Sequence, residues 1–268
     1  MSYQPIFDRL WQDYITQNPS TKQVYNLFIS EGETVINDHI AFRTFDHPSV
    51  NVDRLSQVFL KNGYEFRRYY YFEQKKLNAK HFEHKTDKNA PRVFISELLT
   101  KEFSPYLQST VREWIERIPS NVLGSDSLIH AGNVTGIPVF EVYEKLRSES
   151  EYAAWLYVNG FCANHFTVSV NHLMKYDSLP KVNEFLKSKG FQLNDTGGEI
   201  QGTPEELLEQ SSIRAGIVKF RFAEGEFGIP GCYYEFAKRY PDTDGNLYSG
   251  FIAKSADKIF ESTNFYKK

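Results

Sequence analysis

Polar and apolar side chains alternate along the segment NDHIAFRTF, residues 37–45, and this alternation predicts a β-strand. Successive side chains of a strand point to opposite faces, so His39 and Arg43 share one face, while Ile40 and Phe42 share the other. A polar face on a single strand is most often a solvent-exposed face. The rest of the chain decides between that interpretation and a functional site.

The same pattern returns in CANHFTVSVN, residues 162–171, where His165 lies on the polar face. Each of the two strands precedes a helical pattern that ends at a glycine. His39 lies 24 residues before Gly63, and His165 lies 25 residues before Gly190. An internal repeat of this kind indicates two copies of one supersecondary unit, although chance similarity between two βα units would look the same.

The elements around the first strand follow from local pattern. A start signal at Ser20 and Thr21 and the spacing of the following apolar residues predict a helix before it. A second helix is predicted over residues 51–63, with Asn51 as its N-cap. Tyr-, Phe-, Val- and Ile-rich segments then predict three strands, in YEFRRYYYF, KHFEHK and PRVFISELL.

The second unit has one predicted difference from the first. After LPKVNEFLKSKGFQL, a helix followed by a strand, the residues Thr203, Pro204 and Glu206 form the pattern of a capping box. This pattern predicts a short inserted helix. IVKFRFAEGEF is then interpreted as a strand and a turn, and GCYYEFAKRY, residues 231–240, as the last strand.

We therefore expect an α+β fold. Two βαβββ-type repeats, about residues 35–100 and 162–240, would form curved sheets around a shared metal cleft, with helices behind them. Helical periodicity predicts a connector over about residues 103–158. The whole chain, residues 1–268, is predicted to be a single catalytic domain, because this length is ample for one large core.

Three strands each offer one potential metal ligand on the polar face: His39, His165 and Glu235. Two neutral imidazoles and one carboxylate leave coordination positions open on a metal that prefers six ligands. This set is typical of non-haem Fe(II). In the first repeat, Glu97 is the expected counterpart of Glu235. It follows His39 by 58 residues, whereas Glu235 follows His165 by 70, and the excess of 12 matches the inserted helix.

Cysteine ligands are an alternative way to hold a metal. Cys162 lies three residues before His165 and Cys232 three before Glu235, which suggests a zinc site. An odd spacing on a strand turns each cysteine away from its neighbouring ligand, so buried packing positions are the better interpretation.

Arginines lie near two of the predicted ligands. Arg43 follows His39 by four residues, so their Cα atoms are about 13 Å apart along a strand, with room for a small acid between the side chains. A guanidinium suits a carboxylate because its fork bonds both oxygens. A salt bridge to Asp or Glu explains Arg43 equally well. Arg239, four residues after Glu235, is expected at a solvated strand end.

Composition narrows the functional class. A net charge of −3 gives no basic field for nucleic acid or an anionic membrane. We find no signal-peptide pattern, no apolar run of 18 residues, and only two cysteines, so a soluble, cytoplasmic protein is expected.

Four segments together resemble the 2-oxoadipate dioxygenase/decarboxylase family, also called hydroxyglutarate synthases: NDHIAFRTF, NHFTVSVNHL, IQGTPEELLEQSS and PGCYYEFAKRY. The resemblance spans about residues 30–240, although well-known members are considerably longer. It implies a fold similar to the vicinal oxygen chelate enzymes and Fe(II) held by the two histidines and the glutamate.

The same resemblance implies the reaction and the substrate contacts. A 2-oxo dicarboxylic acid, 2-oxoadipate, would react with O2 to give 2-hydroxyglutarate and CO2, and Arg43 would bind the substrate. Gln201, Thr203 and Ser212 are weaker candidates for substrate binding from the matched segment, and helix capping explains Thr203 without a substrate. Two other classes stay open: a Zn²⁺- or Ni²⁺-dependent isomerase or hydrolase on the same scaffold, and a non-catalytic module that binds a small acid.

Overall fold

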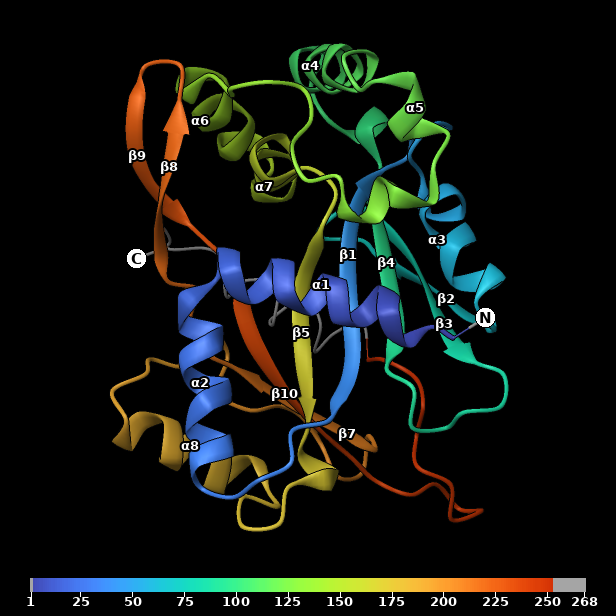
Figure 1. Cartoon of the computed structure of the whole chain (residues 1–268), viewed down its shortest axis with the longest axis vertical. Coiled ribbons are helices and arrows are strands. Elements are labelled where there is room, and N and C mark those ends of the chain that lie inside the picture. Colours follow the sequence, from blue (N-terminus) through green and yellow to red (C-terminus); the bar gives the residue numbers. More distant parts are fainter. Residues whose placement is uncertain (1, 253–268) are drawn as a thin grey trace.

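The computed structural model describes residues 2–252, and its centre is one mixed sheet of eight strands in the order β2-β3-β4-β1-β5-β10-β7-β6 (Figure 1). The first half of the sheet comprises β1 (Asn37–Phe45), β2 (Tyr64–Phe72), β3 (Leu77–His84) and β4 (Arg92–Leu98). The second half comprises β5 (Ala163–Ser169), β6 (Gln201–Thr203), β7 (Leu208–Ser212) and β10 (Tyr233–Arg239).

The two halves repeat one arrangement. In each, the first strand pairs in parallel with the last, as β1 does with β4 and β5 does with β10. The first strands β1 and β5 then pair with each other in antiparallel fashion at the centre of the sheet. The expected α+β fold with two βαβββ-type repeats is therefore confirmed.

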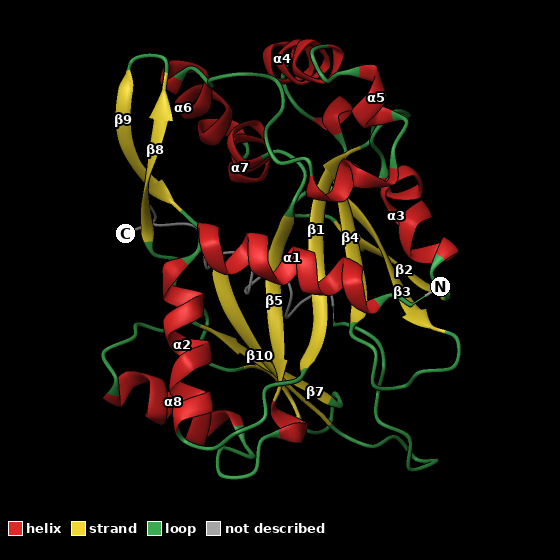
Figure 2. Ribbon diagram, viewed as in Figure 1, coloured by secondary structure: helices red, strands yellow, loops and turns green. Residues whose placement is uncertain are grey.

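Helices cover the apolar back of this sheet: α1 (Gln4–Gln17), α2 (Pro19–Ser30), α3 (Val52–Lys61) and α8 (Leu179–Ser188). Figure 2 shows α1 running across β4, β1 and β5. Aromatic contacts hold the layers together, with ring centroids 5.0 Å apart for Trp11 and Phe166 and 5.5 Å for Phe59 and Phe42. The predicted helices α2 and α3 are confirmed, with Asn51 accepting a hydrogen bond from the Arg54 amide. Sequence reasoning missed α1.

The connector between the repeats is helical, as expected. It contains α4 (Pro105–Glu116), α5 (Ser120–Leu123), α6 (Phe140–Glu149) and α7 (Glu151–Asn159). Short 3₁₀ turns lie at Thr100–Glu102 and Asp126–His130, and a third, Val170–His172, follows β5. The Tyr152 hydroxyl fixes α7 against the sheet, because it donates to the Ser96 carbonyl at 2.7 Å and accepts from the Thr44 amide at 3.0 Å.

The inserted helix predicted from Thr203, Pro204 and Glu206 is wrong. The segment is the β6–β7 hairpin, the counterpart of β2–β3. Thr203 Oγ1 does accept from the Glu206 amide at 3.2 Å, but a tight turn satisfies that bond as well as a helix does. Leu207, with φ +65°, then returns the chain to β7.

The insertion lies elsewhere, in the hairpin of β8 (Ile217–Phe222) and β9 (Gly225–Pro230). This hairpin stands apart from the main sheet beside α6 (Figure 1), where Phe227 stacks on Phe140 with ring centroids 3.8 Å apart. The predicted strand and turn in IVKFRFAEGEF are therefore confirmed. The strand predicted just after α8 is not, since only an isolated bridge joins Leu193 to Ile213 there.

Gly160 sets the direction in which the chain enters β5, and we expect the variant Gly160→Ala to be strongly destabilised. Gly160 has φ +66° and ψ −145°, and an added Cβ would lie 2.0 Å from the Gly132 carbonyl oxygen. We expect the free energy of unfolding in urea to fall by about 2–3 kcal/mol. Gly190→Ala is the matched control, because Gly190 also has a positive φ (+86°) but has no atom within 4 Å of its added Cβ. Equal losses in the two variants would contradict the prediction.

Candidate metal centre

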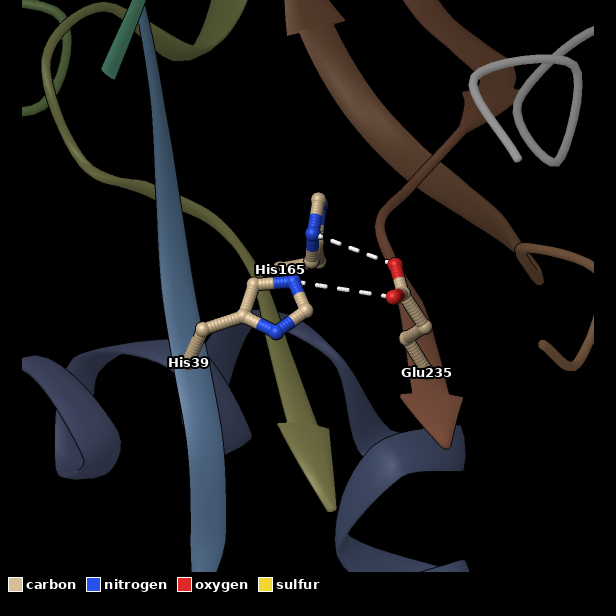
Figure 3. A group of neighbouring side chains, drawn as sticks. All are labelled: His39, His165 and Glu235. Atoms are coloured by element: carbon tan, nitrogen blue, oxygen red, sulfur yellow. Dashed lines mark ion pairs between the residues drawn. The ribbon is translucent and has the colours of Figure 1, made fainter. Parts of the chain in front are cut away.

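Three buried side chains converge on the open face of the sheet: His39 from β1, His165 from β5 and Glu235 from β10 (Figure 3). Their potential ligand atoms all lie within 4.8 Å of one another. His39 Nε2 is 3.5 Å from Glu235 Oε1, and His165 Nε2 is 3.2 Å from Glu235 Oε2. The structure thus brings together the three residues that the sequence pattern selected.

Strand register explains this convergence. His39 lies opposite Thr167, and Thr167 lies opposite Glu235, so these three residues form one row across β1, β5 and β10. In the next row, Ala41 lies opposite His165, and His165 lies opposite Tyr233. The antiparallel pairing of β1 with β5 therefore relates the two histidines by a local twofold axis.

The two imidazoles are oriented by the residues that precede them. Asp38 Oδ2 lies 2.8 Å from His39 Nδ1, and Asn164 Oδ1 lies 3.1 Å from His165 Nδ1. If each Nδ1–H donates to its oxygen, each Nε2 directs a lone pair towards Glu235. Metal-ligating histidines are commonly held in this way, through a second hydrogen bond at the other ring nitrogen.

The electrostatics of the cluster favour a bound cation. Burial lowers the pKa of both His39 and His165, so the imidazoles are neutral near pH 7 and able to coordinate. Burial also raises the pKa of Glu235 to about 8, although the Gln210 amide donates to its Oε1 at 2.5 Å. Burial beside two neutral imidazoles thus disfavours the ionised carboxylate, and a divalent cation would supply the positive charge that stabilises it. The donor set therefore fits a metal.

Asp38 links His39 to a network of charged side chains. Arg239 donates to it twice, from Nε at 2.7 Å and from Nη2 at 2.9 Å, and Arg92 Nη1 lies 3.3 Å away. Burial alone would raise the pKa of Asp38, but the two arginines and the bond with His39 hold it well below its usual range.

The expectation that Arg239 is solvated is wrong, since only 2% of it is exposed. Its Nη1 donates to the carbonyls of Tyr248 and Gly250, so the chain beyond β10 folds back over this strand end. The same segment places Phe251 against His39, with ring centroids 4.8 Å apart. The local pattern of β10 gave no signal for this long-range cover.

Glu97 is not the structural counterpart of Glu235. His39 pairs with Arg92 as His165 pairs with Tyr233, so the position equivalent to Glu235 is Phe94. Glu97 Oε2 instead accepts from the Val52 amide at 2.9 Å, at the start of α3. The excess length of the second repeat comes from the β8–β9 hairpin rather than from an inserted helix.

Arg43 is buried on the same face as His39 and is only partly satisfied. Its Nη1 lies 3.2 Å from Glu151 Oε1, and its guanidinium carbon lies 4.9 Å from the Tyr152 ring centroid and 5.2 Å from that of Trp155. The sequence offers two interpretations of Arg43, a salt bridge to Asp or Glu and a binding site for a substrate carboxylate, and both apply to this side chain. The salt bridge exists, yet the buried Nε and Nη2 have no hydrogen-bond partner among the described residues.

A cavity of about 700 Å³ opens beside Arg43. The guanidinium lines it together with Glu151, Tyr152, Trp155 and, from β9, Ile229. Arg43 is therefore the residue that both shares the polar face of β1 with the cluster and borders this cavity. The arrangement gives a buried cationic fork next to a space large enough for a small organic acid.

The weaker substrate candidates occupy different surroundings. Gln201 donates to the carbonyls of Thr196 and Gly198, and Thr203 is an exposed turn residue. Ser212 is buried and lies opposite Glu235 in the β7–β10 pairing. A contact that sequence reasoning missed is Gln210, whose amide bonds the proposed carboxylate ligand; its signal lay in a strand that was mistaken for a helix.

The two cysteines are packing residues, as expected from their spacing. Cys162 and Cys232 are free, buried thiols, and burial raises the pKa of each. Within residues 2–252, the group of side chains suited to hold a metal contains neither cysteine.

Solved structures establish the fold class by similarity. The rice hydroxyglutarate synthase, solved in complex with 2-oxoadipate, aligns with a TM-score of 0.90 and 34% identity over 98% of this chain and 92% of that one. A Shewanella frigidimarina protein, provisionally described as a hydrolase, aligns with a TM-score of 0.88 and 46% identity over 94% and 98% of the chains. A Ralstonia eutropha protein provisionally assigned to the glyoxalase superfamily shares the fold, with a TM-score of 0.73 and 19% identity over 90% and 83% of the chains.

Sequence comparison agrees with the structural one. The Arabidopsis thaliana chloroplastic 2-oxoadipate dioxygenase/decarboxylase is 35% identical over 97% of this chain and 77% of its own length. Within the described residues, no helix has the length and apolar character needed to cross a bilayer. The sequence profile of the 2-oxoadipate dioxygenase/decarboxylase family matches residues 5–123 and 126–244. The chain therefore belongs to the 2-oxoadipate dioxygenase/decarboxylase family.

Proposed function

We propose that this protein is an Fe(II)-dependent dioxygenase/decarboxylase that converts 2-oxoadipate and O2 to 2-hydroxyglutarate and CO2. The observation that carries the proposal is the pairing of a buried His-His-Glu cluster with a buried guanidinium, Arg43, two of whose nitrogens have no hydrogen-bond partner within residues 2–252. The names of the rice and Arabidopsis relatives, and the 2-oxoadipate bound to the rice structure, support the choice of substrate.

His39, His165 and Glu235 would hold the iron, leaving up to three coordination positions for other ligands. When bound, Fe(II) would activate O2 and would be chelated by a 2-oxo acid. One oxygen atom of O2 would enter the new carboxylate that forms at the former 2-oxo carbon as the original carboxylate departs as CO2, and the other would enter the hydroxyl group. The substrate itself supplies the electrons, so no second organic acid is required.

The protein's own residues bind and orient the acid. The Nε–H and Nη2–H of Arg43 suit a bidentate carboxylate, and its Nη1 stays with Glu151. The aromatic faces of Tyr152 and Trp155 fix the plane of the guanidinium. Holding a carboxylate in one place selects the carbon that reacts, and such orientation contributes several kcal/mol to catalysis.

Oxygen uptake tests the proposal directly. Protein reconstituted anaerobically with Fe(II) receives 2-oxoadipate and air-saturated buffer, and O2, CO2 and 2-hydroxyglutarate are measured. We expect a 1:1:1 stoichiometry that needs both iron and substrate, with Zn²⁺-loaded protein as the inactive control. Turnover with Zn²⁺ and no O2 consumption would instead favour an isomerase or hydrolase, and 2-oxoadipate binding without turnover would favour a binding module.

The cytoplasmic location stays a prediction.

The variant Arg43→Lys tests the assigned role of the guanidinium. Lysine keeps the positive charge but lacks the planar fork, so we expect KM for 2-oxoadipate to rise about 10- to 100-fold. Iron content, measured by metal analysis, should be unchanged, because Arg43 is not among the clustered ligand residues. An unchanged KM and kcat would restrict Arg43 to its structural pairing with Glu151.

A further inference from the structure

The hydroxyl of Tyr233 is a buried donor on the face of the candidate metal centre. Tyr233 is 0% exposed, and its hydroxyl has no hydrogen-bond partner among the described residues. It precedes Glu235 by two residues on β10 and lies opposite His165 in the strand pairing. Its ring stacks on the His165 imidazole, with centroids 4.8 Å apart and planes at 27°.

A buried hydroxyl without a partner is unfavourable, and buried polar groups are normally hydrogen-bonded. Such a group therefore needs an explanation. Tyr234, the next residue, also has a buried hydroxyl without a partner in the described part of the chain, so burial alone does not distinguish the two. Tyr234 points to the opposite face of the sheet, where its ring lies 5.8 Å from that of Trp11 in α1. Only Tyr233 faces the side that carries the metal cluster and Arg43.

Strand register places Tyr233 between the cluster and Arg43. Ala41, His165 and Tyr233 form one row, and Arg43 lies one step further along the same face of β1. Electrostatics agree with this placement, because Glu235 and Arg43 are, after burial, the two groups that most influence the pKa of the Tyr233 phenol. A tyrosine hydroxyl can donate one hydrogen bond.

The unsatisfied donors here form a matched set. Arg43 offers Nε–H and Nη2–H, and Tyr233 offers O–H, all buried and all without partners within residues 2–252. A carboxylate has two oxygens with about four acceptor sites, so it can accept all three bonds. A neutral group such as a methyl would leave all three unsatisfied.

We propose that the Tyr233 hydroxyl donates a hydrogen bond to the same substrate carboxylate that Arg43 binds, the one remote from the metal, and so selects dicarboxylic over monocarboxylic 2-oxo acids. This inference rests on the proposed function and extends it to specificity. A site that leaves buried donors unpaired discriminates strongly against the ligand that lacks the acceptor.

The experiment compares Tyr233→Phe with the matched control Tyr234→Phe. Both variants remove one buried, unpartnered hydroxyl from the same strand, but on opposite faces. Binding of 2-oxoadipate to the Fe(II)-loaded proteins is measured anaerobically by calorimetry, which requires no turnover. The same titrations are made with 2-oxohexanoate, which has a methyl group in place of the remote carboxylate.

We expect Tyr233→Phe to weaken 2-oxoadipate binding about tenfold or more, the size expected for a hydrogen bond to a charged group, and to change 2-oxohexanoate binding less than about twofold. Tyr234→Phe should bind both acids like the unmodified protein. Equal binding of 2-oxoadipate by both variants would overturn the inference alone, as would an equal loss for the two acids in Tyr233→Phe. If the unmodified protein bound no 2-oxoadipate, the proposed function would fail as well.

Discussion

The variant Glu235→Gln is expected to lose stoichiometric iron binding while keeping its fold. Glutamine has nearly the same shape and still accepts from Gln210, but it removes the only carboxylate among the three clustered side chains. Residues outside the coordination sphere already contribute 10- to 100-fold to metal affinity, so the loss of a direct ligand should exceed about 100-fold. Metal analysis after reconstitution and desalting measures the effect, and oxygen uptake should fall with it.

Glu97→Gln is the matched control for this variant. Glu97 is also a carboxylate on a strand of the same sheet, but it caps α3 through the Val52 amide. We expect iron content to be retained in Glu97→Gln, with a modest loss of stability of about 1 kcal/mol. Full iron occupancy in Glu235→Gln would refute the assignment of Glu235 as a ligand, and iron loss in Glu97→Gln would restore its predicted role near the metal.

The three clustered residues could be identified from sequence because two simple periods coincide. The period of two in a strand sets which side chains share a face, and the repeat places His39 and His165 at equivalent positions of two strands. Neither argument needs the three-dimensional path of the chain. The same parity identifies Arg43, and the structure adds what the sequence could not show, that two nitrogens of Arg43 have no partner among the residues it describes.

Counting residues along the two repeats identifies the wrong counterpart of Glu235, because the insertion in the second repeat is expected in the wrong place. The prediction of Glu97 as counterpart assumes that a short helix accounts for the extra length of the second repeat. The extra residues form the β8–β9 hairpin, and the true counterpart of Glu235 is an apolar residue, Phe94. Only the second repeat supplies a carboxylate at this position. The two related repeats therefore form a single three-residue cluster within the described residues.

The residues that support the cluster were hidden for a different reason. Arg239 reaches Asp38 across the sheet, and Phe251 packs on His39 from a segment beyond the last strand. These contacts join positions about 200 residues apart, and no local pattern encodes them. The sequence therefore predicted which residues could bind a metal, but not what holds them in place.

The variant Asp38→Asn is expected to cause the largest loss of stability. Asp38 is the shared acceptor of two arginines and lies 2.8 Å from His39 Nδ1, with 2% of its side chain exposed. Asparagine would leave the buried Arg239 and the partly buried Arg92 without the charge of Asp38. Removing one partner of a buried ionic network typically destabilises by about 3–5 kcal/mol. Urea unfolding at pH 7 measures this loss, and a weaker affinity for iron should accompany it, because His39 loses its orienting carboxylate.

Asp126→Asn separates the burial of an ion pair from its mere presence. Asp126 lies 2.7 Å from Lys61 Nζ, as short a contact as that between Asp38 and Arg239, but its side chain is 43% exposed and that of Lys61 57% exposed. Water solvates the remaining lysine in this variant, so we expect a loss below about 1 kcal/mol and unchanged iron affinity. A similar small loss in Asp38→Asn would mean that the arginines find other partners, and that the buried network does not hold the metal centre in place.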